Sequence, residues 1–334
     1  MAHGAEWVKE GGFGVGGVAY LKRKSGGLLA LVAALWLGLS AAGAVPAAPV
    51  PATRAPAPAA PAAPRPAIWL LSDDDTQIYL FGTIHILPPD LHWRSSELDR
   101  VVAEADELVL EIAETPDGEE GDELGALMLL GKDVPITHRV SPERRAGLEA
   151  MVAAAGMPIE TFDSMQTWAV AVALAAMAVA QEYAGDSGVA PEDLTGVEEV
   201  LRADFRARNR PVSGVETTAQ QLGIFSRMPL HVQRTMLESM VDAYLAGDTG
   251  IMDPGEDGWV RGDTDGIAAE MQQMPPELFV PLLVTRNRAW TQYLIARLER
   301  PGKVLFAVGA GHLAGDASVQ SMLAARGFRV RRVN

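Results

Sequence analysis

Four apolar segments of the sequence carry a histidine or a glutamate at or near their ends. The segments "QIYLFGTIH", "ELVLEI", "PVSGVET" and "VLFAVGAGH" contain His85, Glu111, Glu216 and His312. Each segment is typical of a β-strand. If the strands are parallel, their carboxyl ends share one edge of a sheet, where ligands bind. Two imidazoles and two carboxylates at such an edge can hold a divalent metal ion or transfer protons during hydrolysis. Polar residues at strand ends also hydrogen-bond loops, so the residue types alone leave both interpretations open.

The two histidines share a short pattern, Gly82-x-x-His85 and Gly309-x-x-His312. The pattern is weak by count, because 33 glycines and 6 histidines give about 0.6 matches by chance. The context is more informative, since both copies follow an apolar strand and open a loop. We expect Gly82, Gly309 and Gly311 to allow sharp turns off the strand or a close approach of the backbone to a ligand.

Composition limits the chemistry and the partners. The chain of 334 residues has no cysteine, which excludes disulfides, thiolate nucleophiles and cysteine-ligated metal sites. Its formal net charge is −15, and the positive residues needed to contact many phosphates are scarce. We therefore expect no nucleic-acid partner. The expected partner is a peptide or another small substrate, while the oligomeric state is not specified by the sequence.

Longer segments resemble a known family. "YLFGTIHILPPDL" followed by "ADELVLEI", then "GVEEVLRADFRARNRPVSGVETTAQQLGIFSRMP", then "LLVTRNRAWTQYLIARLERPGKVLFAVGAGHLAGDASVQSMLAARGFRVRRV", are similar to successive parts of the TraB/GumN family. That family includes the TIKI metalloproteases. The similarity extends over about residues 67–334. It implies an α/β fold related to the erythromycin-esterase and ChaN-like proteins, and, in the TIKI branch, proteolysis supported by manganese or cobalt.

The resemblance also implies roles for individual residues. His85, His312, Glu111 and Glu216 match positions that are catalytic or metal-binding, and the pair Arg286-Asn287 matches an Arg-Asn pair of the family. A bound manganese, cobalt or zinc ion would activate a water molecule, and a glutamate would take its proton. Arg286 would stabilise an oxyanion or a substrate carboxylate, or would instead form a buried ion pair with Glu111 or Glu216.

The sequence departs modestly from the family pattern at one position. In Gly196-Val197-Glu198, the family pattern predicts an aspartate at the third position, where this chain has Glu198. Glu198 keeps the negative charge but has one more methylene group, so its carboxylate reaches further.

Strands alternate with helices along residues 67–334, which predicts an α/β domain with a mainly parallel central sheet flanked by helices, and a helical insertion in the middle third. Continuous helices are expected over about 161–183 and 260–273, and Ser141 is expected to cap a helix that has Pro142 at its first position.

The N-terminal segment has the features of a signal peptide. Basic residues Lys22–Lys24 precede an apolar run and an Ala-Gly-Ala sequence at 42–44, which is typical of a signal peptide over residues 1–45. The alternative is an uncleaved anchor, because residues 28–45 give about 18 residues, barely enough to span a bilayer. The Pro/Ala-rich residues 46–66 are expected to form an extended linker. We therefore expect a periplasmic or secreted protein that touches a membrane only if the anchor is retained.

Three functions follow from these features. The first is an exported, metal-dependent hydrolase that resembles a metalloprotease. The second is a metal-independent hydrolase of the esterase type, in which histidine and glutamate activate water. The third is a non-catalytic periplasmic protein that binds a ligand or regulates a partner.

Overall fold

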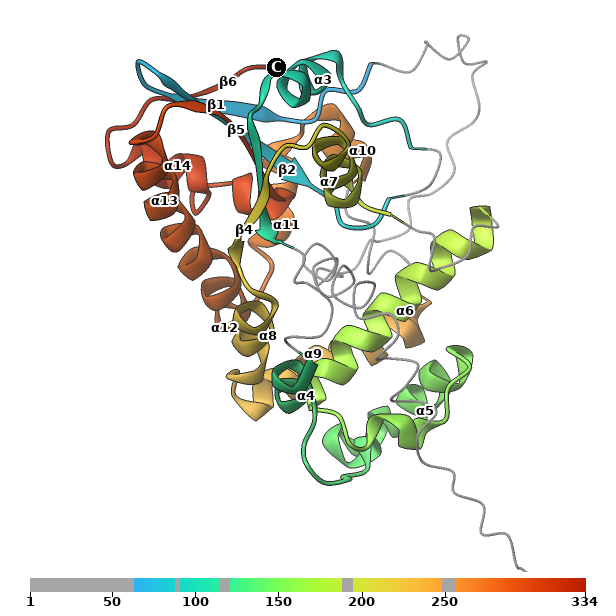
Figure 1. Ribbon diagram of the computed structural model, residues 1–334. Helices are drawn as coiled ribbons and strands as arrows, with labels where there is room; N and C mark the ends of the chain where they lie inside the picture. The colour runs from blue at the N-terminus through green and yellow to red at the C-terminus, as the bar shows by residue number, and fades with distance from the viewer. Residues whose placement is uncertain (1–62, 88–90, 114–120, 188–194, 248–255) are drawn as a thin grey trace, which may run out of the picture.

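The computed structural model describes residues 63–87, 91–113, 121–187, 195–247 and 256–334 (Figure 1). The predicted leader and most of the predicted linker lie outside these residues. Pro66 and Ala67 are already buried, and the N–H of Arg65 donates to the carbonyl of Val260 at 2.7 Å. Among the described residues, none of the helices combines the length and the apolar character that crossing a membrane requires.

A six-stranded sheet in the order β4-β3-β5-β2-β1-β6 forms the centre of the fold. Its strands are β1 (Ile68–Ser72), β2 (Thr76–Thr83), β3 (Glu107–Ile112), β4 (Val212–Glu216), β5 (Gly302–Gly309) and β6 (Val330–Arg332). The pairs β4–β3, β3–β5 and β5–β2 are parallel, whereas β2–β1 and β1–β6 are antiparallel. The expectation of an α/β fold with a mostly parallel sheet flanked by helices is confirmed.

Helices lie on both faces of this sheet and beyond one of its edges (Figure 1). They are α3 (Ser96–Glu104), α4 (Gly121–Met128), α5 (Arg145–Ala154), α6 (Thr167–Ser187), α7 (Val197–Ala207), α8 (Thr218–Ser226), α9 (Leu230–Ala246), α10 (Glu256–Arg261), α11 (Thr264–Met271), α12 (Pro276–Phe279), α13 (Thr285–Leu298) and α14 (Val319–Ala324). A π-helical turn, η6 (Val280–Val284), joins α12 to α13. Short 3₁₀ turns are η1 (Ile136–Arg139), η2 (Pro142–Arg144), η3 (Ile159–Phe162) and η7 (Ala310–Leu313).

Alternation along the strands gives the sheet two apolar faces. Trp69, Leu71 and Leu80 belong to one buried cluster, which α13 and α14 complete with Trp290, Leu294, Leu298, Val319 and Leu323. The neighbouring residues Ile68 and Leu70 belong to a larger cluster on the other face, which includes residues of α3 and α7. Because helices cover both faces, β5 is buried from Val304 to Val308.

The parallel strands end at a common edge. Thr83 at the end of β2 lies opposite Gly309 at the end of β5, and Ile112 of β3 lies opposite Glu216 of β4. The residues that follow these strands therefore leave the sheet side by side, which is the arrangement that the sequence predicts for the candidate site.

Helices α4, α5, α6 and α9 lie together beyond this edge (Figure 1). That they form an insertion stays a prediction.

Three local expectations were wrong in detail. The helix expected from 161 begins at Thr167, and Ile159–Phe162 form the separate 3₁₀ turn η3. The side chain of Asp163, which follows η3, accepts from the N–H of Ile136 at 2.8 Å and ties this segment to η1. Gly262, with φ of 72°, ends α10 and breaks the helix expected over 260–273. The Ser141 side chain does not cap a helix, because its hydroxyl accepts a hydrogen bond from the Arg144 side chain at 2.9 Å and none from a backbone N–H.

Candidate functional site

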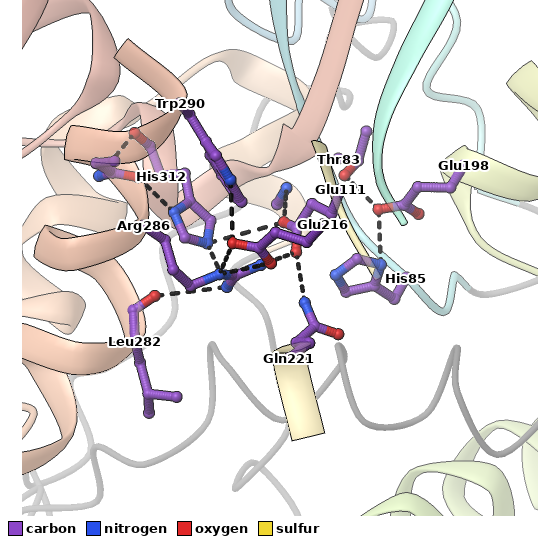
Figure 2. Close-up of polar contacts among 12 residues, drawn as sticks. Thr83, His85, Glu111, Glu198, Glu216, Gln221, Leu282, Arg286, Trp290 and His312 are labelled. Atoms are coloured by element: carbon purple, nitrogen blue, oxygen red, sulfur yellow. Dashed lines mark hydrogen bonds and ion pairs between the residues drawn. The ribbon is translucent and has the colours of Figure 1, made fainter. Parts of the chain in front are cut away.

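The predicted residues converge at the carboxyl edge of the sheet. Figure 2 shows Glu111 and Glu216 in the middle, with Arg286 and His312 on one side and His85 on the other. These side chains come from the ends of β3 and β4, the first turn of α13, the η7 turn after β5 and the loop after β2. The structure therefore brings together all five residues that the sequence singles out.

Arg286 joins the two central carboxylates. Its Nη2 donates to Glu111 Oε2 at 2.5 Å and to Glu216 Oε2 at 2.8 Å, and its Nε donates to both oxygens of Glu216 at 2.9 and 3.0 Å. Its Nη1 faces the carbonyl of Leu282 at 3.4 Å and Nε2 of His312 at 3.0 Å. All three guanidinium nitrogens thus bind groups of the protein. This geometry corresponds to the buried ion pair that we considered, not to a guanidinium left open for substrate.

The π-helical turn before α13 helps to place Arg286. Val280–Val284 is a π-helix, and the carbonyl of Leu282 within it faces the guanidinium. Such turns occur frequently at functional sites. The helix then presents Arg286, Asn287 and Trp290 within its first two turns, and each of the three contacts the candidate site.

His312 is fixed at both ring nitrogens. Its Nδ1 lies 2.6 Å from Oδ1 of Asn287, whose amide nitrogen donates to the carbonyl of Ala317 at 2.7 Å. The oxygen of Asn287 accepts, so Nδ1 of His312 carries the hydrogen and Nε2 accepts from Arg286. Burial and the adjacent Arg286 cation lower the pKa of His312 to about 3. His312 is therefore neutral at physiological pH.

Trp290 packs against the same group. Its ring centroid lies 4.3 Å from that of His312, and the Arg286 guanidinium lies 4.6 Å from the Trp290 ring centroid. Its Nε1 donates to Glu216 Oε1 at 3.0 Å. The indole therefore holds the imidazole, the guanidinium and a carboxylate in one arrangement.

The pKa values of the two central carboxyl groups are shifted in opposite directions. Burial opposes ionisation of Glu111, but the Arg286 cation, the two histidines and the Gly309 N–H together outweigh it and hold the Glu111 pKa well below its usual range. Glu111 also accepts from the N–H of Gly309 at 2.8 Å and from Gln221 at 2.9 Å. For Glu216, burial dominates and raises its pKa even though Arg286 is bound. A carboxylate held like Glu111 is a poor proton acceptor.

His85 has a different environment from His312. Its Nδ1 lies 2.6 Å from Oε1 of Glu198, and the hydroxyl of Thr83 donates to the same oxygen. Within the described residues, Nε2 of His85 has no hydrogen-bond partner. Burial lowers the His85 pKa, but the Glu198 carboxylate outweighs burial and raises it above 6.5. The His85 side chain is 13% exposed, compared with 4% for His312.

The position that a Cβ atom would occupy at Gly309 lies between the two halves of the site. A Cβ atom added at Gly309 would lie 3.2 Å from Glu111 Oε1 and 3.7 Å from both His85 Nε2 and a ring carbon of His312. Glycine therefore keeps this space open between the two imidazoles. Gly82 is closely approached by Ala310, where an added Cβ would lie 3.0 Å from its Cα. None of Gly82, Gly309 and Gly311 has a positive φ, so close approach and not a left-handed turn explains them.

We tested whether these side chains fit a metal ion. Within the described part of the chain, no group of three or more histidine, aspartate and glutamate side chains is arranged to hold one. The Arg286 cation fills the position between Glu111 and Glu216 and binds Nε2 of His312. The predicted ligand set of His85, His312, Glu111 and Glu216 is therefore not assembled with these side-chain positions. Metal use stays a prediction.

A family model covers nearly the whole of the described body. The model of the TraB/PrgY/gumN family matches residues 67–332. The chain belongs to the TraB/PrgY/gumN family. This confirms the family resemblance of the sequence. Comparison with curated proteins and with solved structures gave no match.

Membership of the family leaves the chemistry to be argued from the site. Four residues whose side chains contact the predicted ones were not named as site residues from the sequence: Thr83, Glu198, Gln221 and Trp290. Glu198 had a signal, because it occupies the position where the family pattern predicts an aspartate. Thr83 and Gln221 are common polar residues whose partners lie 115 and 110 positions away.

Proposed function

We propose that this protein is an exported hydrolase, with peptide bonds as the favoured target, in which His85 activates water. The observation that carries the proposal is the difference between the two histidines. Both are held through Nδ1, but Nε2 of His312 binds Arg286, whereas Nε2 of His85 is directed at the space beside Gly309 and has no partner among the described residues. Export rests on the leader pattern alone, and the peptide target on the family resemblance.

The proposed reaction begins with a water molecule between His85 and the substrate carbonyl. Nε2 of neutral His85 takes a proton from the water as its oxygen adds to the carbonyl carbon, and the imidazolium then returns that proton to the leaving group. The Glu198 carboxylate at Nδ1 raises the His85 pKa, which makes Nε2 a stronger proton acceptor than that of an ordinary imidazole. Glu111 and Glu216 would hold Arg286, and the charges of Glu198 and Glu111 would favour the imidazolium form of His85.

The decisive experiment measures hydrolysis of a peptide library by purified residues 63–334, a range that retains the backbone hydrogen bond of Arg65 to Val260 and the buried Pro66. We expect His85→Gln to lower kcat by at least about 100-fold while the thermal midpoint changes little, in line with the usual contribution of a general base. Glu97→Gln, on the exposed side of α3, is the matched control and should keep full activity. Full turnover in His85→Gln would refute the role of His85.

The predicted metal requires a separate test. Protein treated with a chelator is titrated with Mn²⁺, Co²⁺ and Zn²⁺ while metal uptake is followed by calorimetry and hydrolysis is assayed in parallel. Stoichiometric uptake that disappears in His85→Ala/His312→Ala would support a metal-dependent hydrolase. Uptake that is the same in the parent and in the double variant would discard that prediction.

A further inference from the structure

The first turn of α7 lies against the loop that carries His85. The N–H of Val197 donates to the carbonyl of Ile84 at 2.9 Å, and the N–H of Leu87 donates to the carbonyl of Thr195 at 3.1 Å. A Cβ atom at Gly196 would lie only 2.0 Å from the carbonyl oxygen of His85. Only glycine permits this approach, so two segments more than 100 positions apart are joined backbone to backbone.

This contact brings Glu198 to the imidazole. Glu198 is in the first turn of α7, where the helix dipole favours a negative charge. Its Oε1 accepts a hydrogen bond from Nδ1 of His85 at 2.6 Å and another from the hydroxyl of Thr83. An ionised carboxylate only accepts hydrogen bonds, so the neutral imidazole must carry its hydrogen on Nδ1. The lone pair is then on Nε2, the atom that faces the space beside Gly309.

We propose that Glu198, held in place by Thr83, is the positioning residue of His85: it fixes the ring orientation and the Nδ1–H tautomer. The proposal rests on the proposed function for its effect on turnover, but not for its effect on the ring. It also gives a reason for the glutamate where the family pattern predicts an aspartate. The longer side chain reaches His85, and the Thr83 hydroxyl restricts the extra torsion.

Two readouts separate this proposal from the proposed function. The first is long-range ¹H–¹⁵N NMR of the His85 ring in the resting protein, recorded at a pH where the ring is neutral. We expect one Nδ1–H tautomer in the parent chain, a mixture of both tautomers in Glu198→Ala, and a smaller change in Thr83→Val. The control is Glu199→Gln, the neighbouring exposed glutamate, which pairs with Arg202 and should leave the ring unchanged.

The second readout is turnover. Loss of an orienting partner of this kind costs about 10–100-fold, so Glu198→Ala should lower kcat by that factor with KM nearly constant, and Glu198→Asp should recover part of it. An unchanged tautomer in both Glu198→Ala and Thr83→Val would overturn the positioning role. If the parent chain hydrolyses nothing but the tautomer shifts as expected, the proposed function fails and the positioning role stands. Thr83→Val supplies the NMR test should Glu198→Ala not fold.

Discussion

Removing the Arg286 charge should destabilise the protein by an amount that depends on pH. Arg286 is 3% exposed and binds two carboxylates, of which Glu111 is 6% exposed. In Arg286→Met the side-chain volume is partly kept, but two buried negative charges lose their cation. Breaking a buried ion pair by removing one partner costs about 3–5 kcal/mol. For a domain of this size that lowers Tm by about 6–20 °C.

The pH dependence identifies the cause. In the parent chain the Glu111 pKa is depressed, so its contribution to stability is present above the unfolded value of about 4.3 and is lost as pH falls through the folded value. Without Arg286, burial raises the pKa of Glu111 and raises that of Glu216 further. Both carboxyl groups then take up protons as pH falls, and the destabilisation should shrink between pH 7.5 and pH 5.5.

Urea unfolding followed by tryptophan fluorescence at both pH values measures this effect. Glu216→Gln/Arg286→Met, which removes one unpaired charge, should recover about 1 kcal/mol or more of the loss. Arg326→Met, at an exposed position of the same protein, should change stability by less than about 0.5 kcal/mol. A loss below about 1 kcal/mol in Arg286→Met, or an equal loss at both pH values, would refute the argument that buried charge controls stability at this site.

Three further predictions follow from the same contacts. The rate of hydrolysis should rise with pH as His85 loses its proton, with a midpoint above 6.5. In Glu198→Gln this midpoint should move to lower pH, because the carboxylate that raises the His85 pKa is replaced by a neutral amide. An unchanged midpoint would contradict this. Asn287→Ala should lower the free energy of unfolding by about 1–3 kcal/mol, which urea unfolding measures, because Nδ1–H of His312 loses its acceptor. NMR of the His312 ring should show the loss of that hydrogen bond. Gly196→Ala should destabilise by about 1–3 kcal/mol because it forces α7 off the His85 loop. Its control, Gly125→Ala, has open space around it and should be neutral or slightly stabilising.

The strands and their common edge could be predicted because both depend on local patterns. Apolar runs that end in glycine marked β2 and β5, and β3 matched its expected bounds of Glu107–Ile112. Once the strands are parallel, topology alone places His85, Glu111, Glu216 and His312 at the same edge. These predictions needed no knowledge of individual side-chain contacts.

The partners of those residues could not be predicted, because nothing in the spacing specifies them. Glu198 lies 113 positions after His85, and their contact depends on how α7 docks against the loop through Gly196. The choice between two roles for Arg286 was also beyond the sequence. It depends on whether Glu111 and Glu216 lie close enough to share one guanidinium, which only the positions of β3 and β4 determine.

The contrast between the two histidines follows from their nearest charges. Both belong to a Gly-x-x-His pattern and both use Nδ1 to bind an acceptor, but the acceptor of His85 is a carboxylate and that of His312 is a neutral amide. The nearest charge to His312 is the Arg286 cation, which disfavours a second positive charge. The pKa of His85 is therefore raised and that of His312 is lowered. Arg286 binds the Glu111 and Glu216 carboxylates, whereas Glu198 binds His85 itself, and the charges of Glu198 and Glu111 favour the imidazolium that hydrolysis would create on His85.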